Sequence, residues 1–194
     1  VNIDHIASIR NARGEGHPDV LKAAKYVMSL GADSITIHLR EDRRHINDKD
    51  LIMLSKNKKI PINLELSTNK KIINLALKCK PKFVCLVPEK RNEVTTEGGL
   101  NLKKNIKKIN YIIKLFNKNK IRTSLFINPN IEDIKLSKKV NVKCIEIHTG
   151  KLSRLVRSKK NFNFELNKIK KCTKYANSLG IDVHAGHGLD YKST

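Results

Sequence analysis

The chain has 194 residues, of which 39% are hydrophobic and 5% aromatic. This length predicts one domain with a sizeable core and is too short for two full-sized enzymatic domains. No stretch approaches the roughly 18 uninterrupted apolar residues of a membrane helix, and the opening VNIDHIASIR lacks the layout of a signal peptide. We therefore expect a soluble, cytoplasmic protein with no membrane partner.

The formal net charge of +22 lies entirely in residues 51–194, because residues 1–50 hold eight basic and eight acidic side chains. The excess is mostly Lys interleaved with Ile and Asn, as in KKNIKKINYIIKLFNKNK (103–120). Arg and aromatic residues, which carry stacking and bidentate recognition, are not enriched there. We expect no specific nucleic-acid partner. A basic nucleic-acid-binding protein remains the alternative from a different functional class.

The four cysteines are scattered singly and show neither zinc-type CxxC spacing nor the density of a disulfide framework. No HxH, HExxH or DxD grouping presents metal ligands together. We therefore expect free thiols and no metal. Metal-dependent hydrolysis remains a minor enzymatic alternative, because side chains from different strands can converge.

Apolar, β-branched runs alternate with amphipathic segments along the chain. Strands are predicted over 1–6, 34–39, 60–66, 83–88, 122–127, 144–149 and 181–186. Helices are predicted over about 18–30, 48–57, 68–79, 101–118 and 164–179, with Asn47 as a cap and Gly31 and Gly180 as terminators. The strand starts lie on average about 30 residues apart, which is the length of a βα unit and predicts a parallel sheet.

The placement of polar residues decides between two parallel architectures. Residues two apart on a strand point to the same side, so Thr36, His38 and Arg40 lie opposite three apolar neighbours. Other strands show the same division. A doubly wound sheet would bury these polar groups under helices, whereas a barrel gathers them at its mouth. We therefore predict an α/β fold of the (β/α)₈ TIM-barrel type, with the active site at the carboxyl ends of the strands.

Six segments carry a more specific pattern: VNIDHIASIRNARG (1–14), HLREDRRHINDKD (38–50), NLEL (63–66), LVPEKRNEVTTEGGL (86–100), IEIHTG (145–150) and AGHGL (185–189). In this order, and over the whole chain, they resemble the pyridoxine 5'-phosphate synthases of the deoxyxylulose-dependent vitamin B6 pathway. The resemblance implies a (β/α)₈ barrel, a homo-oligomer and a transferase without a cofactor. It also implies condensation of 3-amino-2-oxopropyl phosphate with 1-deoxy-D-xylulose 5-phosphate to pyridoxine 5'-phosphate, phosphate and water.

The same resemblance implies the site residues. His38 and Glu65 match proton acceptors, His187 matches a proton donor, and Glu146 matches a residue that stabilises the transition state. Ring closure from two carbonyl compounds needs repeated proton transfer near neutral pH, which His and a retuned Glu can supply. Asn2, Arg13 and Gly188 match contacts to the aminoketone phosphate, and Asp4, His5, Arg40, His45 and Thr95 match contacts to the deoxyxylulose phosphate.

Structural roles remain open for the same side chains. His38 or His187 alone is as easily a hydrogen-bonded structural histidine, Glu65 an ion-pair partner and Glu146 a residue that orients a neighbour. The segment EKRNEVTTEGGL (89–100) has the composition of a lid that grips phosphate, and equally of an ordinary long loop. Our hypothesis is that Gly98 and Gly99 form the hinge of such a lid. For the homo-oligomer, the resemblance implies that Arg13 serves the site of a neighbouring subunit.

A complete barrel needs eight strands and about 250 residues. This chain ends at Thr194, just after the seventh predicted strand. We therefore expect residues 1–194 to be a single barrel domain that is incomplete at its C-terminus and lacks the eighth βα unit. A longer chain with that unit is expected to be active, and an inactive fragment of the synthase is the remaining alternative.

Overall fold

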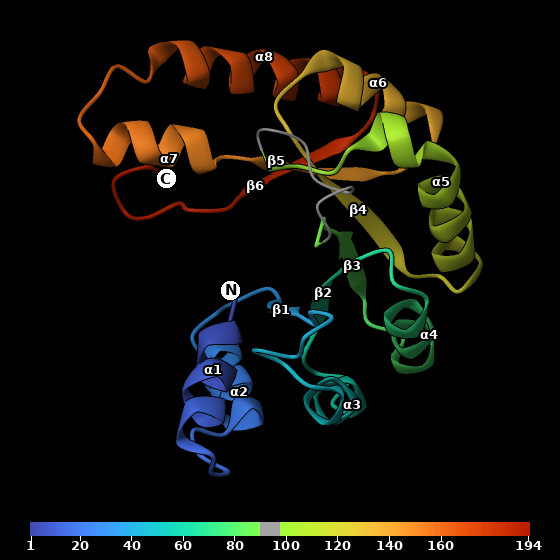
Figure 1. The fold of residues 1–194 in the computed structure, drawn as a ribbon, viewed down its shortest axis with the longest axis vertical. Coiled ribbons are helices and arrows are strands. Elements are labelled where there is room, and N and C mark those ends of the chain that lie inside the picture. The colour runs from blue at the N-terminus through green and yellow to red at the C-terminus, as the bar shows by residue number, and fades with distance from the viewer. Residues whose placement is uncertain (90–97) are drawn as a thin grey trace. The chain divides into compact units, whose positions relative to one another are not determined.

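The computed structural model describes residues 1–89 and 98–194. The described residues form two compact units, the first built from 1–89 and 115–122, the second from 98–114 and 123–194. Parallel strands alternate with helices in each unit (Figure 1). None of the helices in the described ranges is long and apolar enough to cross a bilayer.

The first unit contains three parallel strands in the order β1–β2–β3, which are β1 (Ile35–His38), β2 (Ile62–Leu66) and β3 (Phe83–Leu86). Buried and half-buried residues alternate along β1 and β2, so one side is apolar and the other carries the polar side chains. The register pairs His38 with Glu65. Since both residues lie on the polar side, the two strands bring an imidazole and a carboxyl together at their carboxyl ends.

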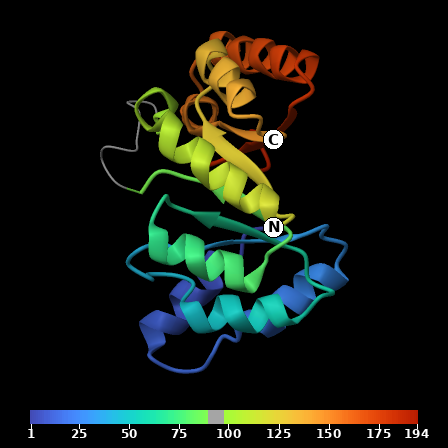
Figure 2. The ribbon, with the colours of Figure 1, turned by 90° about the vertical axis from the view of Figure 1, so that its right-hand side faces the viewer.

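Four helices belong to the first unit: α1 (Asp4–Arg13), α2 (Val20–Ser29), α3 (Asp48–Lys56) and α4 (Lys70–Cys79). Helix α3 lies beside α4 (Figure 2). Asn47 starts α3 with a reciprocal capping box, in which its side chain accepts from the Asp50 N–H and the Asp50 carboxylate accepts from the Asn47 N–H. The predicted cap of this helix is confirmed.

The second unit contains β4 (Arg122–Ile127), β5 (Cys144–His148) and β6 (Asp182–Gly186), again parallel and in that order. Its helices are α5 (Leu102–Lys118), whose last turn belongs to the first unit, α6 (Ile131–Lys139), α7 (Gly150–Arg157) and α8 (Asn163–Ser178). Helices α6 and α8 pack against each other. Ile109, Ile113 and Phe116 of α5 are fully buried, as its amphipathic spacing predicts.

The predicted strand over 1–6 is wrong in extent. Only Asn2 forms a parallel β-bridge, with Thr36, and α1 begins at Asp4. The side-chain oxygen of Asn2 accepts the Asp4 N–H at 2.8 Å, which satisfies a backbone donor that a helix start would otherwise leave free. The alternation of VNIDHI imitates a strand, but the local hydrogen bond turns the chain into a helix.

Six of the seven predicted strands are present in the described residues, and each of the five predicted helices is found within a few residues of its expected bounds. Helices α1, α6 and α7 are additional. The structure therefore confirms the parallel α/β fold, with six strands in the described ranges where seven were predicted.

Candidate active site

His38, at the end of β1, lies between two carboxyl groups of the first unit. Its Nδ1 is 3.6 Å from Glu65 Oε2, and its Nε2 is 3.0 Å from Glu89 Oε1. The His38 side chain is 12% exposed, that of Glu65 20% and that of Glu89 5%. These three side chains have restricted access to water, which strengthens the electrostatic interactions among them.

The two carboxyls respond differently to this environment. Burial raises the pKa of Glu65, helped by the negative charge of Asp4 and opposed by the charge of His38. Burial also acts to raise the pKa of Glu89, but hydrogen bonds from His38 and the Glu41 N–H, with the charges of His38 and Arg40, outweigh it and lower that pKa. The His38 imidazole is therefore flanked by two different carboxyls. That of Glu65 favours its protonated form, and that of Glu89 favours its ionised form.

Asp4 holds the backbone of His38 in place. Its Oδ1 accepts the His38 N–H at 2.8 Å, and its Oδ2 accepts from the Asn2 side chain at 3.0 Å. Asp4 is 7% exposed. The start of α1 is thus bound to the end of β1, and the predicted site residues Asn2, Asp4 and His38 lie together.

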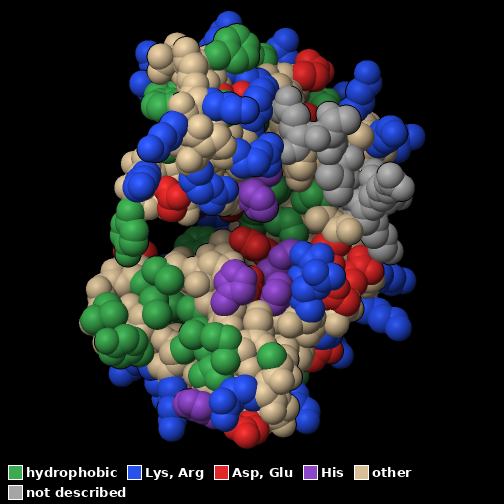
Figure 3. All heavy atoms as spheres, turned by 60° about the vertical axis from the view of Figure 1, so that its left-hand side comes forward, with side chains coloured by type: hydrophobic (Ala, Val, Ile, Leu, Met, Phe, Trp, Pro, Cys, Tyr) green, Lys and Arg blue, Asp and Glu red, His purple; other side chains and the backbone are tan. Residues whose placement is uncertain are grey.

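His45 lies near the same end of α1. Its Nδ1 is 2.6 Å from Ser8 Oγ, and its ring meets that of His5 edge to face at 5.9 Å between centroids. Burial lowers the pKa of His45, opposed by Asp4 and supported by the positive charges of Arg40, His5 and His38. On the outside of this unit, His, basic and acidic side chains gather on one face (Figure 3).

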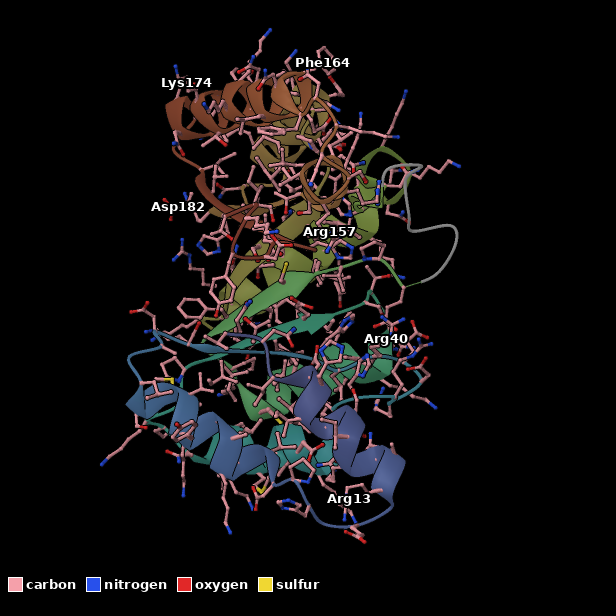
Figure 4. All side chains as sticks on the ribbon, turned by 90° about the vertical axis from the view of Figure 1, so that its left-hand side faces the viewer. Arg13, Arg40, Arg157, Phe164, Lys174 and Asp182 are labelled. Atoms are coloured by element: carbon pink, nitrogen blue, oxygen red, sulfur yellow. The ribbon has the colours of Figure 1, made fainter. Side chains whose placement is uncertain are left out.

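The two predicted arginines differ in their surroundings. Arg40 follows β1; its Nε is buried, lies 3.7 Å from Asp42 Oδ1, and donates to no group among the described residues. Arg13 lies at the opposite end of α1 from Asp4, where it pairs with Glu15, and both side chains are more than half exposed (Figure 4). Within the first unit, Arg13 is thus separate from the group around His38.

The second unit has its own histidine cluster at the ends of β5 and β6. The rings of His148 and His187 stack with centroids 4.7 Å apart, and Phe126 meets the His148 ring edge to face at 5.2 Å. His148 is 7% exposed, and His187 has a positive φ of 79°. The hydroxyl of Thr149 donates to the carbonyl oxygens of Gly186 and His187, which fixes the chain around His187.

The Glu146 carboxylate lies beside Gly186 of β6, where the glycine leaves room for it. A Cβ on Gly186 would overlap Glu146 Oε1, so any larger residue displaces the carboxylate. A Cβ on Gly150 would lie 2.8 Å from His148 and 2.9 Å from His187. Gly188, the remaining predicted contact of this unit, has a φ of 79°.

Sequence reasoning missed two members of these clusters. Glu89 lies in the segment LVPEKRNEVTTEGGL, where roles were predicted for Thr95, Gly98 and Gly99, and its pairing with His38 arises only in the folded chain. His148 shares a strand face with Glu146, two residues away, and this alternation was the available signal.

Thr95 and most of the predicted lid lie outside the described residues. Gly98 has a φ of 107°, and the buried Gly99 N–H donates to Asn128 Oδ1.

Each cluster offers groups that can move protons between heteroatoms and carbon. In the first unit an imidazole adjoins a carboxyl of raised pKa, and a guanidinium with a free Nε donor suits an anionic group. In the second unit a histidine adjoins a carboxylate-bearing strand. Each cluster, taken by itself, thus holds groups suited to general acid–base chemistry.

Comparison with known proteins agrees with this chemistry. Residues 1–194 match the family described as pyridoxal phosphate biosynthesis protein PdxJ. The pyridoxine 5'-phosphate synthase of Pelagibacter ubique is 61% identical over 194 residues, all of this chain and 81% of the relative. That of Zymomonas mobilis is 48% identical over 193 residues and is covered to 75%. A solved structure of D-psicose 3-epimerase from Clostridium cellulolyticum aligns with a TM-score of 0.49 at 13% identity, covering 87% of this chain and 80% of the epimerase. Because the family model matches residues 1–194 and the two synthases are 61% and 48% identical, the chain belongs to the PdxJ family of pyridoxal phosphate biosynthesis proteins.

Proposed function

We propose that this chain carries the active site of a pyridoxine 5'-phosphate synthase. The enzyme condenses 3-amino-2-oxopropyl phosphate with 1-deoxy-D-xylulose 5-phosphate and releases phosphate and water. The observation that carries the proposal is the His38–Glu65 pair at matched positions of β1 and β2, in which burial raises the pKa of the carboxyl. Family membership supports it independently.

In this proposal, His38 and Glu65 accept protons from the substrates during ring closure, and His187 delivers a proton. Glu146 stabilises charge in the transition state. The Glu65 carboxyl is suited to proton exchange near neutral pH because burial opposes its ionisation. The amine of the aminoketone substrate supplies the ring nitrogen, so the chain needs no lysine Schiff base.

The residues proposed to bind substrate are divided between the two phosphorylated substrates. Asp4, His5, Arg40, His45 and Thr95 bind the deoxyxylulose phosphate, and Asn2, Arg13 and Gly188 bind the aminoketone phosphate. The buried Arg40 Nε, which no described residue satisfies, supports an anionic ligand at that position, because a buried donor without an acceptor is costly.

We further propose the architecture that this function implies. Residues 1–194 form one incomplete (β/α)₈ barrel domain, in which the site residues of both units serve the same reaction, with no cofactor. The protein works in the cytoplasm as a homo-oligomer. Association through the surface of α1 and α2 is supported by three apolar side chains that are each more than half exposed. They are Ile9 of α1, Tyr26 of α2 and Leu30, which follows α2.

Ligand-induced stabilisation separates the synthase from a nucleic-acid-binding protein. We expect 1-deoxy-D-xylulose 5-phosphate to raise the thermal midpoint of the chain saturably, whereas Arg40→Gln abolishes most of this rise. The exposed pair of Arg13 and Glu15 offers Glu15→Gln as a control that keeps the response. Tight, steeply salt-dependent retardation of oligonucleotides without stabilisation by the sugar phosphate would instead favour the nucleic-acid-binding protein.

A further inference from the structure

Of the two carboxyl groups described beside the ring of His38, that of Glu89 is the nearer. Its Oε1 lies 3.0 Å from His38 Nε2, whereas Glu65 lies 3.6 Å from Nδ1 on the other side of the ring. The Glu89 side chain is 5% exposed, which is less than the exposed fraction of the His38 or the Glu65 side chain. A pair this buried differs from a surface ion pair, which contributes little and does not fix a side chain.

The second oxygen of Glu89 is also engaged. Its Oε2 accepts the backbone N–H of Glu41 at 2.8 Å. Glu89 follows β3 by three residues, and Glu41 follows β1 by three residues. The carboxylate therefore joins the ends of two strands and is held at both oxygens, so it fixes the direction in which His38 Nε2 points.

The charge states complete the argument. The hydrogen bonds from His38 and Glu41 lower the pKa of Glu89 against the effect of burial, so this carboxylate is ionised and only accepts. The ring nitrogen that faces it must then carry a hydrogen. In the neutral ring the other nitrogen, Nδ1, keeps its lone pair on the side of Glu65.

We propose that Glu89 is a positioning residue for His38: it holds the imidazole as the Nε2–H tautomer and turns the basic Nδ1 toward Glu65. This inference rests on the proposed function for its catalytic meaning, since His38 is the predicted proton acceptor. Glu89 acts through His38 and does not itself exchange protons with the substrate. It extends the site by a residue from the segment after β3.

The test reads the tautomer directly by NMR on the 194-residue chain with ¹⁵N-labelled histidine. The His38 signals are identified by their loss in His38→Gln. At about pH 9, where an ordinary histidine is neutral, we expect a pyrrole-type Nε2 and a pyridine-type Nδ1. Glu89→Gln keeps the size of the side chain but has one acceptor oxygen for two donors, so we expect both His38 nitrogens to shift toward averaged values.

Two further variants guard against a folding artefact. Glu89→Asp retains both acceptor oxygens and should restore part of the tautomer preference. Glu132→Gln changes an exposed residue of α6 and should leave the His38 signals unchanged. In the synthase assay Glu89→Gln should lower kcat ten- to a hundredfold and change KM less than about threefold.

The outcomes separate the two claims. A wild-type His38 in the Nδ1–H form, or a folded Glu89→Gln protein with an unchanged tautomer, would overturn the positioning role whether or not the chain makes product. The expected tautomer change in a protein that neither binds nor converts the two sugar-derived phosphates would retain the positioning of His38 and reject the synthase.

Discussion

Glu65 is the residue whose ionisation the fold opposes most clearly within the first unit, because burial raises its pKa beside His38. A carboxyl with a higher pKa in the folded state binds more protons there than in the unfolded state. The free energy of unfolding therefore falls as pH rises from the unfolded value, near 4.5, through the folded value. The side chain that serves proton transfer thus costs stability at neutral pH.

Replacing this carboxyl should expose that cost. We expect Glu65→Gln to raise the free energy of unfolding by about 1 kcal/mol at pH 8 and to change it little at pH 4, where wild-type Glu65 is protonated. Urea unfolding at both pH values measures the difference, with Glu132→Gln as an exposed control. A Gln variant that is less stable than wild type at pH 8 would show that His38 compensates the charge of Glu65 fully.

Gly186 allows a second test at the scale of one residue. A Cβ added at this position would overlap the far end of the flexible Glu146 side chain, so we expect Gly186→Ala to displace the carboxylate rather than unfold the strand. Synthase activity should fall at least tenfold, because small misplacements of catalytic groups are costly, while the free energy of unfolding changes by less than about 1 kcal/mol. Gly16→Ala, which meets no atom within 4 Å, is the control. Undiminished product formation by Gly186→Ala would argue against a role for Glu146.

Short-range signals in the sequence predicted most helices and strands but not all of them. The β-branched runs located β1 to β6, and the spacing of Ile109, Ile113 and Phe116 located α5. Helix α6 was missed although Asn130 caps it and acidic residues occupy its first turn, which are readable signals. Helix α7 had no such signal, because Thr149 bonds to β6 instead of capping the helix.

The residues of the candidate site could also be predicted only in part from short-range signals. The family motifs gave His38 and Glu65, and the alternation along strands placed both on one side. Glu89 could not be chosen in this way, because its role depends on its contact with His38, which is distant in sequence. Alternation places His148 on the strand face of Glu146 but does not show that its ring stacks on His187. Such pairs are decided by strand order and by burial rather than by local spacing.

The capping box of α3 is the clearest local device at the scale of an element. Asp50 is 4% exposed and binds Arg10 of α1 as well as the Asn47 N–H, so the helix start also anchors α1. We expect Asn47→Ala to lower the free energy of unfolding by about 1 kcal/mol and Asn47→Ser to restore most of it. Denaturant titration of both variants checks this; equal losses in the two would mean that packing, and not the cap, holds α3.

At the scale of the whole molecule, the chain combines a neutral N-terminal quarter with a Lys-rich remainder. The Lys and Arg side chains in view are spread over both units, as solvated helix faces would be (Figure 3). The chemistry is concentrated instead at the carboxyl ends of the parallel strands of each unit. This is where barrel enzymes carry their active sites, and it supports a proton-transfer enzyme over a polyanion-binding protein.

The most direct test measures pyridoxine 5'-phosphate formed from 3-amino-2-oxopropyl phosphate and 1-deoxy-D-xylulose 5-phosphate. The protein is this chain extended by the parts of the Pelagibacter ubique relative that lie outside the matched residues, compared with its His38→Asn variant. We predict product formation by the joined chain and a rate at least about a hundredfold lower in the variant. A folded joined chain that binds the sugar phosphate without forming product, or a variant as active as its parent, would contradict the account.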